Sequence, residues 1–64
     1  MTIYDIKQQL KEIQSFSNSG DYEAAHRAED VLYQAVLEYL ADQGNALARE
    51  ALRSQVLAFP RHCA

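Results

Sequence analysis

The residues best suited to chemistry include one group at helical spacing, in which Glu29 and Asp30 follow His26 by three and four positions. In a helix these spacings place side chains on one face, as helical metal ligands require. A second carboxylate or the Cys63 thiolate could complete a divalent-metal site. However, two or three ligands on one helix do not make a site, and no second matching motif occurs. We therefore interpret the group as a His–Glu hydrogen bond at a face boundary and predict no metal. A metal-dependent enzyme that uses His26, Glu29 and Asp30 is one alternative function, less favoured than the two described below.

The chain has one cysteine, Cys63, which follows His62 directly. A thiol becomes a nucleophile when a neighbouring base or cation favours the thiolate. Adjacent residues do not ordinarily face one another, and a terminal tail organises a site poorly. The sequence also contains no phosphate-binding glycine loop, catalytic-triad order or zinc-ligand spacing. We therefore predict no catalytic residue, no cofactor and no enzymatic activity.

Three arginines, Arg49, Arg53 and Arg61, form a possible anion-binding set. Guanidinium groups suit carboxylates and phosphates. With the tyrosines of an oligomer they could trap a small anionic nucleotide, and such a nucleotide sponge is the main alternative function. They can equally pair with acidic side chains, within the chain or across a dimer. The candidates are Glu29, Asp30 and Glu50. We favour this structural pairing.

Three of these side chains, those of His26, Glu29 and Asp30, lie on one element, a predicted helix over residues 21–43. Ser19 or Asp21 can cap its start, and Gly44 provides a left-handed end. From Glu23 to that glycine there is neither Gly nor Pro. At roughly 100° per residue, polar side chains fall on one side of this helix. The predicted core face lies opposite and consists of Ala24, Ala28, Val31, Leu32, Ala35 and Tyr39.

Between these two faces runs a further set of residues at four–three spacing, which we call the mixed stripe. It consists of Tyr22, His26, Glu29, Tyr33, Val36 and Leu40. Tyrosine combines a large apolar ring with a polar tip, a combination common at interfaces. A helix in a small three-helix monomer needs only one buried face. The mixed stripe is therefore the predicted partner-binding surface.

A second helix is predicted over about residues 3–15. Thr2 and Asp5 form a variant of the capping box, and an apolar seam recurs at three–four spacing. The segment SFSNSG, residues 15–20, is typical of a turn. A connection this short predicts that the first two helices are antiparallel neighbours.

The third helix is predicted over about residues 46–58, with Asn45 as its N-cap. Its apolar positions are Leu47, Ala48, Ala51, Leu52 and Val56. The sequence thus predicts an all-α fold in a single domain, residues 1–64. Three helices surround one small core, and the central helix is the longest.

Length and charge narrow the possible functions. A chain of 64 residues has marginal stability alone, so we expect a homodimer or higher homo-oligomer. A net charge of −3 argues against non-specific nucleic-acid binding. No apolar run reaches the ~20 residues of a membrane span. One free cysteine without a secretory leader indicates a reducing cytoplasm.

The strings DYEAAHRAEDVLYQAVL and ALAREAL, with a terminal FxRxCA pattern, resemble short, mostly uncharacterised helical proteins of tailed phages and prophages. The resemblance covers residues 21–64, and AHxxED and FxRxCA are its most specific motifs. It implies a location in a bacterial host cytoplasm and, by analogy, a modulator or inhibitor of one host protein. The favoured function is therefore a non-enzymatic binding protein that covers a host protein through the mixed stripe.

Overall fold

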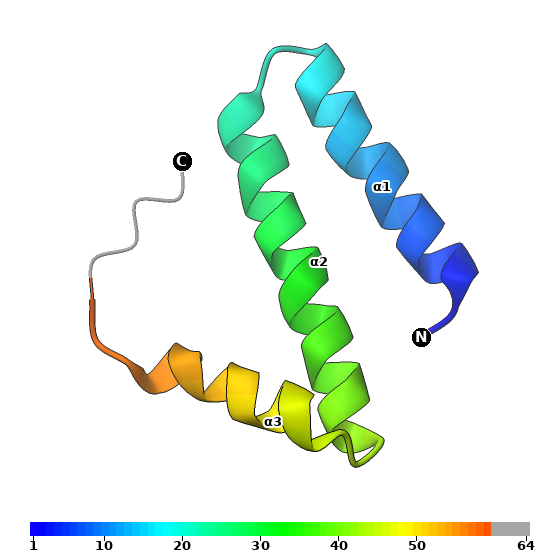
Figure 1. Ribbon diagram of the computed structural model, residues 1–64. Coiled ribbons are helices and arrows are strands. Elements are labelled where there is room, and N and C mark those ends of the chain that lie inside the picture. Colours follow the sequence, from blue (N-terminus) through cyan, green and yellow to red (C-terminus); the bar gives the residue numbers. More distant parts are fainter. Residues whose placement is uncertain (60–64) are drawn as a thin grey trace.

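The computed structural model describes residues 1–59. Within them lie the helices α1 (Ile3–Asn18), α2 (Tyr22–Asp42) and α3 (Ala46–Leu52), followed by the short 3₁₀ helix η1 (Arg53–Val56), and no strand (Figure 1). The predicted all-α, three-helix fold with a longest central helix is confirmed. The predictions for Arg61, His62 and Cys63 lie outside the described residues.

Side-chain caps start all three α-helices. At α1, Thr2 Oγ1 accepts the Asp5 N–H at 3.2 Å, and the Asp5 carboxylate accepts the Thr2 N–H at 2.8 Å. Asp21 and Asn45 each accept the backbone N–H three residues ahead, at 3.1 and 3.0 Å. Such caps satisfy N–H groups that lack a partner within the helix, and each contributes about 1 kcal/mol. The capping box and the Asn45 cap are confirmed, and Asp21 rather than Ser19 caps α2.

The turn between α1 and α2 closes on Gly20, at a φ of 81°. The Gly20 N–H donates to the Ser17 carbonyl at 3.0 Å, and the Asp21 N–H donates to the Phe16 carbonyl at 2.9 Å. This pair of bonds is a Schellman motif, which needs a left-handed residue at the position of Gly20. The residue after the glycine is already the cap of α2.

The turn between α2 and α3 repeats this construction. Gly44 has a φ of 91°, and its N–H donates to the Ala41 carbonyl at 2.9 Å. The next N–H, of Asn45, donates to the Leu40 carbonyl at 3.0 Å, and the Asn45 side chain caps α3. The predicted left-handed end at Gly44 is confirmed.

Two predicted helix ends were wrong. The first helix continues to Asn18 rather than residue 15, because the Schellman motif closes only at Gly20 and a Gln14–Asn18 side-chain bond of 2.8 Å supports the last turn. The third helix is α-helical only to Leu52 and then tightens into η1. Val56 in η1 is 83% exposed, and a short helix without packing is marginal in water.

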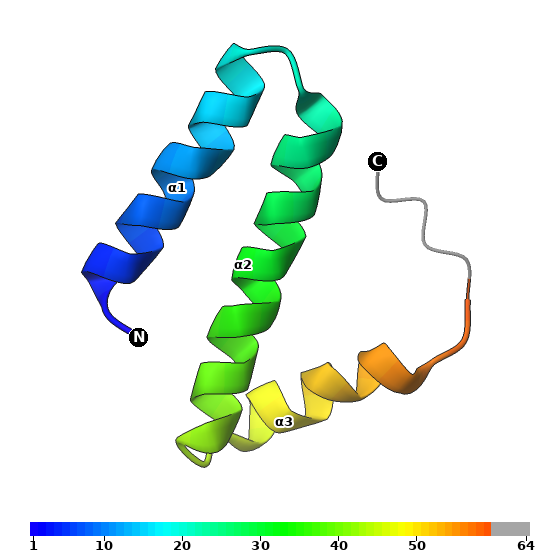
Figure 2. The ribbon, with the colours of Figure 1, turned by 180° about the vertical axis from the view of Figure 1, so that it is seen from behind.

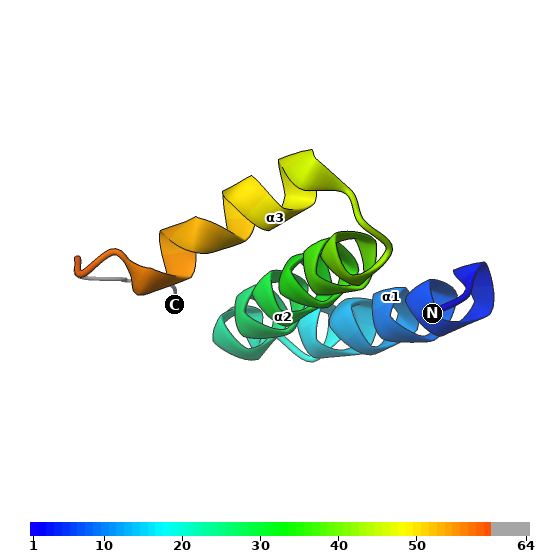
Figure 3. The ribbon, with the colours of Figure 1, turned by 90° about the horizontal axis from the view of Figure 1, so that it is seen from below.

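The helices form one layer rather than surround one core. α1 and α2 are antiparallel neighbours, and α3 turns away at the far end of α2 (Figures 1 and 2). α1 and α3 lie on different sides of α2, and in the described part of the chain they do not touch (Figure 3). The principal-axis extents are 37 × 33 × 10 Å. The predicted single core is thus replaced by two separate helix–helix contacts.

Burial is correspondingly sparse. Within residues 1–59 the buried side chains are Leu32, Ala41 and Ala48. Of the predicted core face of α2, Leu32 is buried and the three alanines are half-buried. Val31 and Tyr39 were wrongly assigned to the core, since both are exposed. Leu47 and Val56, apolar positions of the third helix, are exposed as well, because the layer brings no neighbour to them.

Leu32→Ala should lower the free energy of unfolding by about 2–4 kcal/mol, because it removes the largest buried side chain of the described residues. Leu47→Ala is the matched control. Its leucine is 83% exposed, so this substitution should change stability by under about 0.5 kcal/mol. Urea unfolding followed by circular dichroism measures both. Equal losses in the two variants would contradict this packing.

Gly44→Ala should cost about 1–2 kcal/mol, because alanine is strained at positive φ. A Cβ added there has no atom within 4 Å, so the loss comes from the backbone and not from a clash. The neighbouring substitution Gln43→Ala, at a φ of −81°, should be nearly neutral. Thermal unfolding compares the two, and an unchanged midpoint for Gly44→Ala would refute the left-handed turn.

Candidate functional site

The mixed stripe runs along the full length of α2 and is open to solvent over most of it. Tyr22 and Tyr33 are 71% and 59% exposed, and His26 is exposed as well. Glu29 and Val36 are half-buried, because they lie three and four positions from the buried Leu32 on the helix surface. The stripe therefore has one edge against the packed face of α2 and an aromatic centre in water.

Two i,i+4 contacts organise the ionisable part of this surface. The Tyr33 hydroxyl donates to Glu29 Oε2 at 3.5 Å, at the long end for a hydrogen bond. His26 Nε2 lies 3.9 Å from Asp30 Oδ1, with both side chains about half exposed. The expected His26–Glu29 bond is thus absent, and each residue has a different partner. Exposed pairs of this kind contribute little to stability, so a binding partner can replace them at small cost.

The His26, Glu29 and Asp30 group gains no further metal ligand from the fold. Residues 1–59 contain no cluster of three or more His, Cys, Asp or Glu side chains placed to hold a metal ion. Cys63, the thiol considered as a further ligand, lies outside the described residues.

The two described arginines of the possible anion-binding set have different partners. Arg49 Nη2 donates to the Ala41 carbonyl at 3.4 Å, which ties α3 to the end of α2. Arg53 Nη1 lies 2.8 Å from Glu50 Oε1, so the predicted pairing with Glu50 is confirmed for Arg53. Arg61 lies outside the described residues. The two described guanidinium groups therefore do not share one partner.

The described residues that line a shallow hollow beside Arg53 also lack the features of a nucleotide site. Its lining includes the Glu50 carboxylate and the aliphatic side chains of Val56 and Leu57, but no tyrosine. A carboxylate beside the guanidinium repels a phosphate, and none of the described lining residues has an aromatic ring on which a base could stack. No contact in the described residues favours nucleotide binding.

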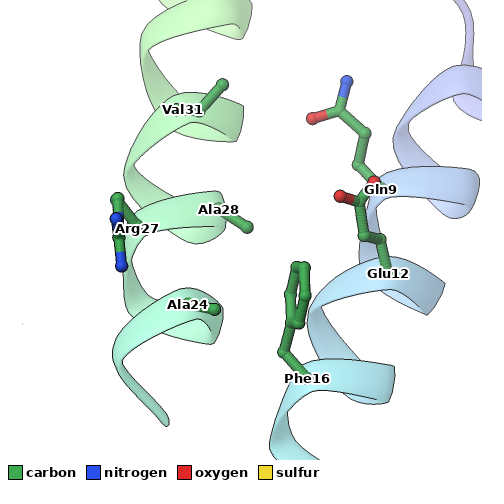
Figure 4. A pocket seen from close by; sticks show the side chains of 7 residues that line it. All are labelled: Gln9, Glu12, Phe16, Ala24, Arg27, Ala28 and Val31. Atoms are coloured by element: carbon green, nitrogen blue, oxygen red, sulfur yellow. The ribbon is translucent and has the colours of Figure 1, made fainter. Parts of the chain in front are cut away.

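A second surface, which the sequence patterns did not predict, lies between the first two helices, and we call it the α1–α2 groove. It has a volume of about 540 Å³ and is lined by Gln9, Glu12, Phe16, Ala24, Arg27, Ala28 and Val31. Figure 4 shows Phe16 projecting from α1 toward the two alanines of α2, with Glu12 on the α1 side and Arg27 on the α2 side. The small side chains at positions 24 and 28 were a signal for this space. Their pattern predicts a filled core, whereas the structure leaves open space beside them.

No helix within residues 1–59 combines the length and apolar character needed to cross a bilayer. Comparison of the chain with protein-family models, curated proteins and solved structures finds no match.

We expect no nucleotide to raise the thermal unfolding midpoint, because Arg53 is paired with Glu50 and the hollow contains no tyrosine. A ligand at 100 times its dissociation constant would add about 2.7 kcal/mol, so a thermal-shift panel of nucleotides can detect binding. A stabilising nucleotide whose effect disappears in Arg53→Ala would contradict this expectation and favour the sponge.

Proposed function

We propose that this protein is a non-enzymatic binding protein that modulates or inhibits a host protein by covering part of its surface with the mixed stripe. One observation carries the proposal: the stripe's two tyrosines stand 71% and 59% exposed on the longest helix of the fold. The packed face of the same helix, marked by Leu32, is a different face. The aromatic side chains are thus not required to hold α1.

The stripe has the form of a helix that binds in a groove. Tyr22, His26, Tyr33 and Leu40 recur along one face of a rigid 21-residue helix, and such recurring anchors are typical of this mode of recognition. Tyrosine is enriched among the residues that dominate interface energies. A helical scaffold also presents its anchors in a fixed geometry, which lowers the entropy lost on binding.

Charge and context suggest the class of partner. The chain has a net charge of −3, and Glu29 and Asp30 lie within or beside the stripe. A partner groove with an apolar floor and basic edges would match this pattern. The resemblance to phage and prophage proteins suggests a protein of the bacterial host, bound in the host cytoplasm. The effect on that host protein would follow from occupying a surface that it needs for its own contacts.

The double variant His26→Ala, Tyr33→Ala should bind this partner at least about 30-fold more weakly, since truncation of an interface hot spot costs about 2 kcal/mol or more. Its helical content should stay unchanged, because both side chains are exposed. The partner is first captured from host lysate and identified by mass spectrometry. It is then purified and titrated calorimetrically with each variant.

Gln34→Ala is the matched control, because Gln34 is exposed on the same helix, outside the stripe, and bonds only Glu38 at 3.1 Å among the side-chain contacts described. It should bind the purified partner as the unaltered protein does. Equal affinity of the double variant and the control would show that the mixed stripe is not the interface.

A further inference from the structure

The α1–α2 groove has an apolar floor, an acidic side chain on its α1 side and a basic side chain on its α2 side. Phe16, Ala28 and Val31 supply the floor, and Val31 is 60% exposed. Glu12 comes from α1 and Arg27 from α2. The one ion pair that the described residues give Arg27 is with Glu23, at 3.9 Å between largely exposed side chains, a weak interaction. The groove thus exposes apolar surface and two charged side chains that can form further ion pairs with a partner.

The overall shape leaves this face without a second layer. Stable domains consist of at least two packed layers around a core, whereas these helices form one layer with an extent of 10 Å in its thin direction. α3 packs at the opposite end of α2, near Ala41, so it does not cover the groove. A chain of 64 residues with three buried side chains in its described part needs further burial.

A second copy of the chain is complementary to the groove in the charges that it brings and in the directions of its helices. A two-fold axis parallel to the helices, placed above the groove, sets α1 of each copy across α2 of the other. Because α1 and α2 are antiparallel within one chain, the facing helices are antiparallel as well. Glu12 and Arg27 line the same groove, so the operation places Glu12 of each copy opposite Arg27 of the other. The interface is therefore self-complementary, as a two-fold contact requires.

We propose that the α1–α2 groove is the interface of a homodimer, in which the two α1–α2 hairpins form an antiparallel four-helix bundle. Phe16 and Val31 of both copies fill its centre, and two symmetry-related Glu12–Arg27 pairs flank it. Four-helix bundles bury their facing residues in this way.

The dimer leaves the mixed stripe accessible. Val31 and Tyr22 are nine positions apart, which at about 100° per residue places them about 180° apart around α2. The groove and the stripe thus lie on opposite sides of the helix. A dimer built on the groove presents two stripes on opposite outer surfaces and can bind two partner molecules or two sites at once.

Light scattering after size-exclusion chromatography tests this interface. The unaltered protein should have twice the chain mass, and Val31→Glu should be monomeric with unchanged helical content, because Val31 is 60% exposed in the single chain. Tyr33→Ala, on the opposite side of α2, is the control and should remain dimeric. A monomeric unaltered protein, or a Val31→Glu variant that stays dimeric, would overturn the proposal.

Charge reversal then tests the pairing between copies. Glu12→Arg alone and Arg27→Glu alone each place like charges opposite one another twice, and should weaken dimerisation at least about tenfold. An equimolar mixture of the two variants restores both attractive pairs and should give a heterodimer. A Glu12–Arg27 pair within one chain could not be restored by mixing. Full dimerisation of either single variant, or failure of the mixture to associate, would refute this arrangement.

Discussion

The arrangement of the helices depends on two left-handed glycines. Gly20 and Gly44 each close a helix with a Schellman motif and are followed directly by the cap of the next helix. These turns have a large part in setting the helix directions because side-chain packing contributes little stability. Leu32 is the one large side chain buried in residues 1–59. The backbone geometry of two short turns therefore fixes the directions of the helices, and the side chains refine them.

In this arrangement α2 is the helix that contacts both of the others. One side of it, marked by Leu32, meets α1, and Ala41 near its end meets α3. The remaining circumference holds the α1–α2 groove at Val31 and, about 180° away, the mixed stripe at Tyr22. The chain is 48% hydrophobic and few side chains of residues 1–59 are buried, so many of its apolar groups lie on such open faces. Exposed apolar faces of this kind are often sites of contact with other molecules.

Sequence patterns predicted what is local. The caps at Asp21 and Asn45 and the left-handed turn at Gly44 each depend on residues within about one or two turns of helix. Patterns failed where the answer depends on a neighbour. Val31 and Leu47 have core-like positions in sequence, but the one-layer arrangement leaves both exposed. Predicting the groove requires knowing how α1 and α2 are aligned along their length. Predicting that His26 approaches Asp30 rather than Glu29 requires knowing the side-chain rotamers.

The one-layer shape also affects which kinds of functional site the described residues can form. Catalysis needs several groups converging from different elements into a site that excludes water, where oriented dipoles act strongly. In the described layer the ionisable groups that approach one another, such as His26 with Asp30 and Arg53 with Glu50, are three or four positions apart in the sequence and exposed to solvent. Recognition has weaker requirements, because apolar anchors on a rigid helix become dry only when the partner arrives. The open layer, with tyrosines exposed on one side of α2 and the α1–α2 groove on the other, presents anchors of the kind that recognition requires.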